Sequence, residues 1–224
     1  MHGPGGPARL PCGGGRREKT VRRAHAGVSG AGTGLFQPAA GRGYDYLIGS
    51  VHGLRLDGCL FSVDESPEAF ARLADRCGGV RGLLREYYSL LAQTPERTGC
   101  DILGHFDLVT KFNEGGRFFD PEEPALRAPA LEALETLAAK DVIFEVNTGA
   151  ISRGWRTAPY PAPSLLKEMR RKNARVCITG DSHAAGTLLA GFEQAKALLE
   201  SCGFSSCWYL TESGFREGPL PEIL

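Results

Sequence analysis

The chain has 224 residues, enough to form one substantial hydrophobic core, and a single domain is the default expectation. Its 26 basic side chains balance 26 acidic ones, so we expect neither nucleic acid nor an anionic membrane surface as a partner. The sequence contains no apolar run near the roughly 20 residues that span a bilayer. The seven cysteines are scattered, which favours a reduced, cytoplasmic protein.

Residues 1–43 differ in composition from the rest of the chain. They contain 12 of the 30 glycines, and seven Arg or Lys residues against a single acidic residue, Glu18. Their apolar positions follow neither a two-residue nor a 3.6-residue period. Such a segment buries too little apolar surface to offset the entropy lost on ordering, so we expect disorder outside the fold. A basic arm that binds nucleic acid is the alternative, but interleaved aromatic residues are lacking.

From residue 44 onward, apolar runs of strand length alternate with segments of helical period. Ser66 followed by Pro67 is typical of a helix start, and Gly203 is typical of a helix end. This alternation predicts βα units around a parallel sheet, in a barrel or an open layer. We expect strands at 45–52, 101–108, 142–146, 175–179 and 206–210, and helices near 67–77, 80–96, 128–140, 164–173 and 185–201.

Side chains that bind metals follow three of the expected strands. His52 and His105 each follow one apolar strand, and Asp181 and His183 follow a third. The carboxyl ends of parallel strands meet at one edge of a sheet, so these residues can share a site. Neutral imidazoles and carboxylates suit Zn²⁺, Mn²⁺ or Fe²⁺ better than Mg²⁺. A hydrogen-bonded structural cluster is the alternative interpretation.

The loop after the 142–146 strand adds cationic side chains. Arg153 and Arg156 lie beside a glycine there, and guanidinium groups bind phosphate in a bidentate manner. Two solvated surface arginines are the simpler interpretation of the same pattern. Glu145 and Asn147 alternate along their strand and so can line the same mouth. Lys111 is a third candidate for a phosphate contact, although a plain loop lysine explains it as well.

Five stretches around these residues carry a family resemblance. They are Tyr46-Leu-Ile-Gly-Ser-Val-His52, Asp101-Ile-Leu-Gly-His-Phe-Asp107, Phe144-Glu-Val-Asn-Thr-Gly149, Arg153-Gly-Trp-Arg-Thr-Ala-Pro-Tyr-Pro161 and Thr179-Gly-Asp-Ser-His183. With them, residues 44–224, about four fifths of the chain, resemble the PHP (polymerase and histidinol phosphatase) family in its histidinol-phosphatase branch.

The resemblance implies a distorted (β/α)7 TIM-like barrel with two or three divalent metal ions at its C-terminal mouth. It implies hydrolysis of L-histidinol phosphate, a small-molecule phosphate ester, to L-histidinol and phosphate in histidine biosynthesis. It also implies roles for six residues: metal ligands at His52, His105, Asp181 and His183, of which Asp181 and His183 also count as catalytic, and substrate phosphate contacts at Arg153 and Arg156.

The chain departs from the family at its N-terminus. The family has a His-x-His pair in its first strand, an Asp/His-type motif in its second and a glutamate ligand in its third. Residues 1–43 contain no His-x-His and no run typical of a strand. We therefore expect a barrel that is incomplete at its N-terminus, through a frameshift, a mis-started reading or a truncation.

An incomplete barrel has consequences for stability and activity. Without its first strands, the strand at 45–52 is expected to be an unpaired edge, which favours aggregation or borrowed partners. We therefore expect a poorly stable chain with little or no phosphatase activity. Two alternatives to a histidinol-phosphatase stay open: a PHP phosphoesterase with another phosphate-ester substrate, and a non-catalytic, degenerate barrel.

Overall fold

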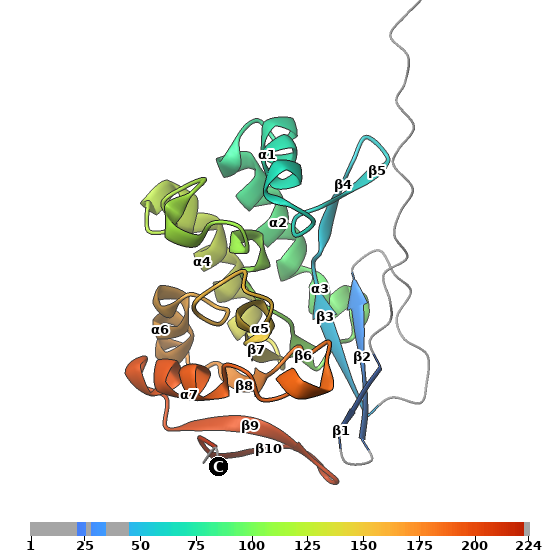
Figure 1. The fold of residues 1–224 in the computed structure, drawn as a ribbon, viewed down its shortest axis with the longest axis vertical. Helices are drawn as coiled ribbons and strands as arrows, with labels where there is room; N and C mark the ends of the chain where they lie inside the picture. Colours follow the sequence, from blue (N-terminus) through green and yellow to red (C-terminus); the bar gives the residue numbers. More distant parts are fainter. Residues whose placement is uncertain (1–21, 26–27, 35–44, 222–224) are drawn as a thin grey trace, which may run out of the picture.

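The computed structural model describes residues 22–25, 28–34 and 45–221 (Figure 1). Its centre is a six-stranded sheet in the order β1-β2-β3-β6-β7-β8. Strands β2, β3, β6, β7 and β8 are parallel, and β1 is antiparallel to β2. The strands are β1 (Arg22–His25), β2 (Val28–Gly34), β3 (Tyr46–Ser50), β6 (Ile102–Leu103), β7 (Ile143–Asn147) and β8 (Arg175–Thr179).

This architecture confirms a mixed α/β fold with a parallel sheet. In the part of the chain that the structure describes, the sheet is open, with β1 and β8 as its two outer strands. The expected closure into a TIM-like barrel is therefore not confirmed. The strand order nevertheless places the ends of β3, β6, β7 and β8 next to one another, as the expected site requires.

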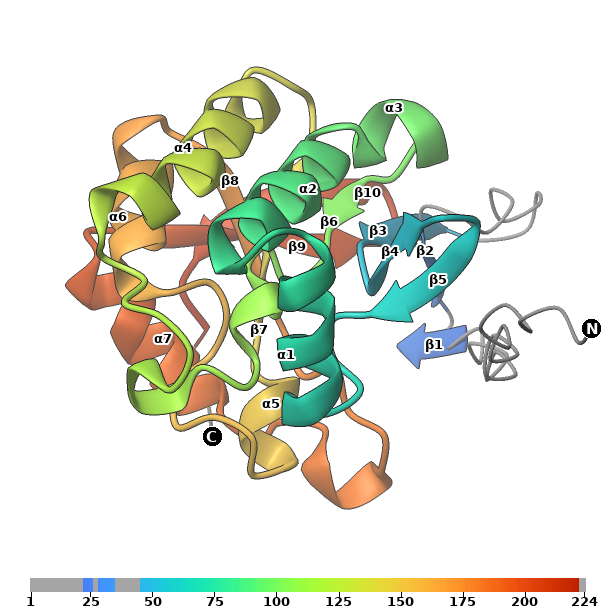
Figure 2. The ribbon, with the colours of Figure 1, turned by 90° about the horizontal axis from the view of Figure 1, so that it is seen from above.

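Helices cover the sheet, and two separate hairpins flank it. Figures 1 and 2 show α2 and α4 side by side, with α1 against α2 and α6 against α4. The β9–β10 hairpin runs along β8, as the lower part of Figure 1 shows. The helices are α1 (Pro67–Arg76), α2 (Val80–Ala92), α3 (Thr94–Thr98), α4 (Pro124–Ala138), α5 (Gly149–Ser152), α6 (Pro163–Arg171) and α7 (Phe192–Ser201), and the hairpin strands are β4 (Gly53–Leu56), β5 (Cys59–Ser62), β9 (Ser206–Thr211) and β10 (Gly214–Pro219).

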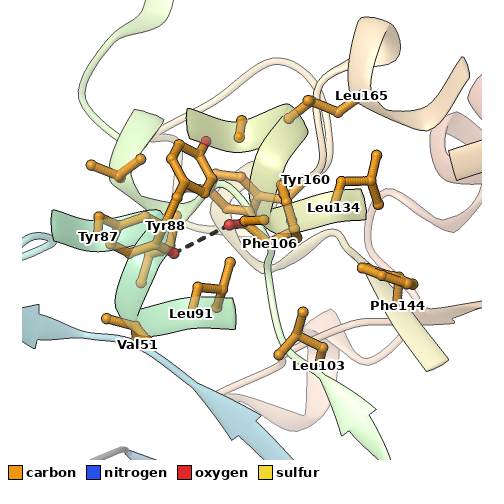
Figure 3. Close-up of a cluster of buried hydrophobic side chains, with 14 of the residues drawn as sticks. Val51, Tyr87, Tyr88, Leu91, Leu103, Phe106, Leu134, Phe144, Tyr160 and Leu165 are labelled. Carbon is orange, nitrogen blue, oxygen red and sulfur yellow. Dashed lines mark hydrogen bonds between the residues drawn. The ribbon is translucent and has the colours of Figure 1, made fainter. Parts of the chain in front are cut away.

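The main core lies between the sheet and helices α2, α4 and α6 (Figure 3). Leu103 of β6 and Phe144 of β7 contribute buried side chains from the sheet, and Leu134 contributes one from α4. Tyr87 of α2 is also fully buried, and its hydroxyl donates a hydrogen bond to the carbonyl of Phe106 at 3.3 Å. This bond fixes the backbone just beyond β6, where the chain leaves the sheet and enters the site.

The N-terminal segment differs in part from the sequence expectation. Strands β1 and β2 lie within residues 1–43, and β2 pairs with β3 from Gly30↔Tyr46 to Gly34↔Ser50. The expectation of disorder outside the fold is therefore wrong for 22–25 and 28–34, and β3 is not an unpaired edge. A strand is held by backbone hydrogen bonds, which a glycine-rich segment supplies without any apolar period. The rest of 1–43 lies outside the described residues.

Several element boundaries also differ, each for a local reason. The helix expected at 80–96 is divided at Gln93 into α2 and α3, because Pro95 lacks an N–H donor for a continuous helix. The strand expected at 101–108 ends at Leu103, since His105 takes a positive φ of 21°. The helix expected from residue 185 begins at Phe192, after Gly191 with φ 78°. The N-cap prediction is confirmed: the Ser66 hydroxyl accepts from the amide of Ala69.

The β4–β5 hairpin was missing from the sequence expectation. Its turn is Asp57-Gly58, with φ values of 49° and 80°. An Asp-Gly pair is a strong signal for a two-residue hairpin turn, because both positions require positive φ. The signal for this hairpin is therefore present in the sequence.

Cys59 corrects the expectation for the cysteines. It is disulfide-bonded, whereas the thiols of Cys77, Cys100, Cys177, Cys202 and Cys207 are free. The expectation of uniformly reduced cysteines is thus wrong at Cys59, because scattered spacing in the sequence carries no information on which residues meet in space.

Of the helices in the described residues, none combines the length and the apolar character that a membrane crossing requires.

Leu134 gives a test of the core. We expect Leu134→Ala to lower the free energy of unfolding by about 2–5 kcal/mol, because it leaves a cavity beneath the parallel sheet. Glu132→Ala, on the exposed face of the same helix, is the matched control and should change it by less than about 0.5 kcal/mol. Urea unfolding followed by circular dichroism measures both. Equal effects of the two substitutions would contradict the assigned core.

Candidate active site

His52 and His105 lie together beyond the ends of neighbouring strands. Strands β3 and β6 pair in parallel at Ile48↔Ile102 and Gly49↔Leu103, so the residues that follow them emerge side by side. The two imidazole rings have centroids 4.8 Å apart and an interplanar angle of 81°. His105 is buried, while His52 is partly exposed. The structure thus brings together two of the four expected metal ligands.

Asp64 joins this pair and was not expected from the sequence. Its Oδ2 lies 3.3 Å from His52 Nδ1 and 3.8 Å from Lys111 Nζ. Lys111 Nζ also donates to the backbone carbonyl of Asp64 at 2.7 Å. Burial opposes ionisation of Asp64, but the hydrogen bond and charge of His52 and the Lys111 ammonium outweigh it and hold the pKa of this carboxyl below its usual range. Asp64 therefore carries a negative charge beside His52.

Glu145 connects the ends of three strands. Its Oε2 accepts hydrogen bonds from the backbone amide of His105 at 2.7 Å and from Asn147 Nδ2 at 2.9 Å. Its Oε1 accepts the Thr179 hydroxyl at 2.5 Å. The side chain is buried, and β7 supplies it between β6 and β8. Glu145 thus lines the mouth as the sequence indicated, and it braces the backbone of His105.

The backbone and ring of His105 both indicate a functional position. Its φ of 21° is unusual for a residue with a side chain, and such strain is retained at sites where the surroundings enforce it. Burial, reinforced by repulsion from His52, lowers the pKa of His105, so its ring is neutral at neutral pH. In the described part of the chain, His105 Nδ1 is buried with no hydrogen-bond partner. An unpaired buried nitrogen of this kind can ligate a metal.

Asp181 is held by Arg153 in the loop beyond β8. Arg153 Nη2 lies 3.1 Å from Asp181 Oδ2, and Nη1 donates to the Asp181 carbonyl at 2.9 Å. Asp181 has a positive φ of 41°, so two of the expected ligands occupy strained backbone. His183 Nε2 lies 3.7 Å from Asp181 Oδ1, and its side chain is 61% exposed. Asp181 and His183 thus form a second pair of candidate ligands.

Arg156 is engaged with its own protein surroundings. Its Nη1 donates to the Thr110 hydroxyl at 2.5 Å, and its guanidinium lies 4.5 Å above the centre of the Tyr160 ring. Asp107, buried nearby, has its pKa raised by burial, an effect that the Arg156 charge opposes. Arg156 therefore contacts Thr110 and Tyr160, while Arg153 lies beside Asp181. A phosphate contact by either arginine stays a prediction.

The loop that carries both arginines is closed at its base by a bridge between Asn147 and Tyr160. The amide of each residue donates to the carbonyl of the other, at 2.9 and 3.0 Å. The Asn147 side chain is fixed as well, since its Oδ1 accepts from the amide of Gly149 at 2.9 Å. The chain between these residues is thus anchored to the end of β7.

The donor set fits a divalent metal in its chemistry. A neutral imidazole with an unpaired nitrogen and an ionised carboxylate are suitable ligands for such a cation. Within residues 22–25, 28–34 and 45–221, however, no three or more His, Cys, Asp or Glu side chains gather in a group that could hold one metal ion. The structure therefore shows paired donors, and their assembly into one metal centre stays a prediction.

Comparison with known proteins gives sequence relatives of one kind, although no family model matches the chain. The chain is 28% identical over 171 residues to the "Probable histidinol-phosphatase" of Schizosaccharomyces pombe, and 26% identical over 177 residues to the histidinol-phosphatase of Bacillus subtilis. The alignments cover 72% and 75% of this chain. They cover 52% and 62% of the relatives, so the chain spans little more than half of their length.

Solved structures with a similar fold carry related names. A protein from Listeria monocytogenes, described as a "putative histidinol phosphatase", matches with a TM-score of 0.58 and 18% identity, covering 67% of this chain and 57% of its own. The histidinol phosphate phosphatase of Lactococcus lactis, solved with zinc, L-histidinol and phosphate, matches with a TM-score of 0.54 and 21% identity, covering 77% and 62%. The two structures show the shared fold. Together with the sequence relatives, they support the resemblance to PHP-type histidinol-phosphatases.

Glu145 can be tested by a matched pair of substitutions. We expect Glu145→Ala to lower the free energy of unfolding by about 1–3 kcal/mol, because it leaves the buried His105 amide without an acceptor. Glu145→Gln should cost less, since an amide oxygen can replace Oε2. Urea denaturation of both variants measures the difference. Indistinguishable costs would show that the acceptor at His105 is unimportant.

Gly149 gives a second test, because it lies against the Asp181–Arg153 pair. A Cβ at this position would lie 2.7 Å from Asp181 Cβ and 2.9 Å from Arg153 Nη2. We expect Gly149→Ala to displace Asp181 and to lower the free energy of unfolding by about 1–3 kcal/mol. Gly186→Ala is the matched control, because a Cβ there meets nothing within 4 Å. Thermal unfolding compares the two variants, and a harmless Gly149→Ala would refute the close approach.

Proposed function

We propose that this chain is a metal-dependent phosphomonoester hydrolase that converts L-histidinol phosphate and water to L-histidinol and phosphate. One observation carries the proposal: His52, His105 and Asp181 follow parallel strands of a fold that histidinol phosphatases share. The Lactococcus lactis neighbour, solved with zinc, L-histidinol and phosphate, supports both the metal and the substrate. In this proposal, residues 44–224 form the PHP-like unit, and strands β3, β6, β7 and β8 are part of a distorted (β/α)7 barrel.

The proposed metal ligands are His52, His105, Asp181 and His183. Asp64 is a fifth candidate donor, because its carboxylate already contacts His52. Zinc, manganese or iron suits this mixture of imidazole and carboxylate, with two or three ions in the family site. Such a cation, when bound, polarises a phosphoryl oxygen and lowers the pKa of water.

The chain's own cations are proposed to bind and orient the phosphate. Arg153 uses two N–H groups for its hydrogen bonds to Asp181. Because a guanidinium has five N–H groups, the others can bind a phosphate oxygen. Arg156 is the second proposed contact, although its present contacts are Thr110 and Tyr160. Lys111 adds positive charge beside Asp64. Fixed cations of this kind stabilise the charge that develops on a phosphoryl group during transfer.

The proposal predicts slow, metal-dependent release of phosphate from L-histidinol phosphate by the purified chain. Asp181→Asn should reduce the rate by at least about 10-fold, because it removes a charged ligand. Asp141→Asn is the matched control: Asp141 precedes β7, at the opposite end of the sheet, is 95% exposed and pairs with Arg175. A colorimetric phosphate assay measures the rates with zinc or manganese added, and again after chelation with EDTA.

The same assay separates the alternatives. Faster turnover of an aryl phosphate than of L-histidinol phosphate would favour a phosphoesterase with another substrate. Tight binding of L-histidinol phosphate in calorimetry, without phosphate release above the EDTA control, would favour a non-catalytic barrel. If the chain neither binds L-histidinol phosphate nor releases phosphate from it, the proposed function is contradicted.

A further inference from the structure

Trp155 is a large aromatic side chain that the proposed chemistry does not use. It lies in the loop between α5 and α6, two residues after Arg153, and is 44% exposed. An indole covers a large apolar area, so its exposure leaves surface available to a ligand. The Trp155 ring therefore presents apolar surface to a ligand.

The exposed ring is held in place by its neighbours. Phe112, which is buried, contacts it edge to face, with ring centroids 5.2 Å apart and an angle of 84°. The amide of Trp155 donates to the carbonyl of Ala150 in α5 at 2.9 Å. A surface ring with these contacts loses little further freedom on binding a ligand, which favours a binding role.

The ring also lies next to the charged groups of the site. Lys111 Nζ is 5.7 Å from the centre of the Trp155 ring and 2.7 Å from the carbonyl oxygen of Asp64. Asp64 in turn contacts His52, so a single ammonium connects the indole with the histidine pair. A phosphate ester bound at that pair would have its organic part within reach of the ring.

We propose that Trp155 is a specificity-determining residue that packs against the organic part of the phosphate ester, and that it selects esters with an aromatic or cationic organic group. The inference rests on the proposed function, whose substrate carries an imidazole ring and an ammonium group. Indole is the best side chain for contacts with cations, and it also packs well against rings. An aliphatic or inorganic phosphate offers neither interaction.

Fluorescence reports on this contact directly. The chain has two tryptophans, so Trp208→Phe leaves Trp155 as the single indole. Trp208 belongs to the β9–β10 hairpin and lies against Arg175, away from the residues of the site. We expect saturable quenching of the Trp155 emission by L-histidinol phosphate, and also by L-histidinol, but no change with inorganic phosphate. Equal quenching by inorganic phosphate would overturn the proposal.

Affinity gives the second measurement. In calorimetry on the metal-loaded chain, Trp155→Ala should weaken the binding of L-histidinol phosphate by about 5- to 30-fold and leave that of inorganic phosphate unchanged. Trp155→Phe should retain most of the affinity, and Trp208→Phe all of it. Trp155→Ala also removes the contact with Phe112, so we expect a lower unfolding midpoint, with the chain still folded at the temperature of the binding measurement, which circular dichroism checks.

The outcomes distinguish this inference from the function on which it rests. Unchanged affinity in Trp155→Ala, while the parent chain still releases phosphate from L-histidinol phosphate, would overturn the inference and leave the function intact. If the parent chain neither binds nor hydrolyses L-histidinol phosphate, the proposed function fails and the inference fails with it. If Trp155→Ala also weakened the binding of inorganic phosphate, Trp155 would have a structural role and the inference would be overturned.

Discussion

Glu145 joins three neighbouring strands at the edge of the sheet where the candidate ligands lie. The ladder between β6 and β7 comprises two residue pairs, Ile102↔Ile143 and Leu103↔Phe144, and the backbone of β6 then leaves the sheet. Beyond the end of this ladder, the Glu145 carboxylate accepts a hydrogen bond from the backbone amide of His105. The same carboxylate holds the Thr179 hydroxyl at the end of β8. A buried carboxylate is costly without partners, so these bonds stabilise one arrangement of the three strand ends.

That arrangement also explains how strained backbone persists at the site. His105 and Asp181 both have positive φ, which for residues with a side chain costs free energy that the surroundings must offset. Glu145 holds the backbone of His105 from one side, and the two bonds from Arg153 hold Asp181 on the other. Each strained residue is therefore fixed by a charged side chain from a neighbouring segment.

The sequence predicted the parts of the site that depend on local pattern. Apolar runs followed by His52 and His105 placed these residues correctly at adjacent strand ends, because strand position follows from periodicity. Asp64 could not be predicted from the ends of the main strands, because it follows the β4–β5 hairpin outside the main sheet. Glu145 braces the site through hydrogen bonds to Thr179 and His105, which lie 34 and 40 positions away from it in the sequence. Sequence spacing alone does not reveal such contacts. Strand β2 could not be predicted from an apolar period either, because its place in the sheet depends on backbone pairing with β3.

The bridge between Asn147 and Tyr160 has a consequence for how the chain can evolve. Both ends of the intervening loop are bonded to each other at the rim of the sheet, and the loop is exposed at residues 153–155 and 157. Apart from Gly149 and Arg153, which are held in contact with Asp181, changes at its exposed positions leave the strands undisturbed. A scaffold with such a replaceable segment beside its reactive groups can acquire a new ligand preference while conserving its chemistry.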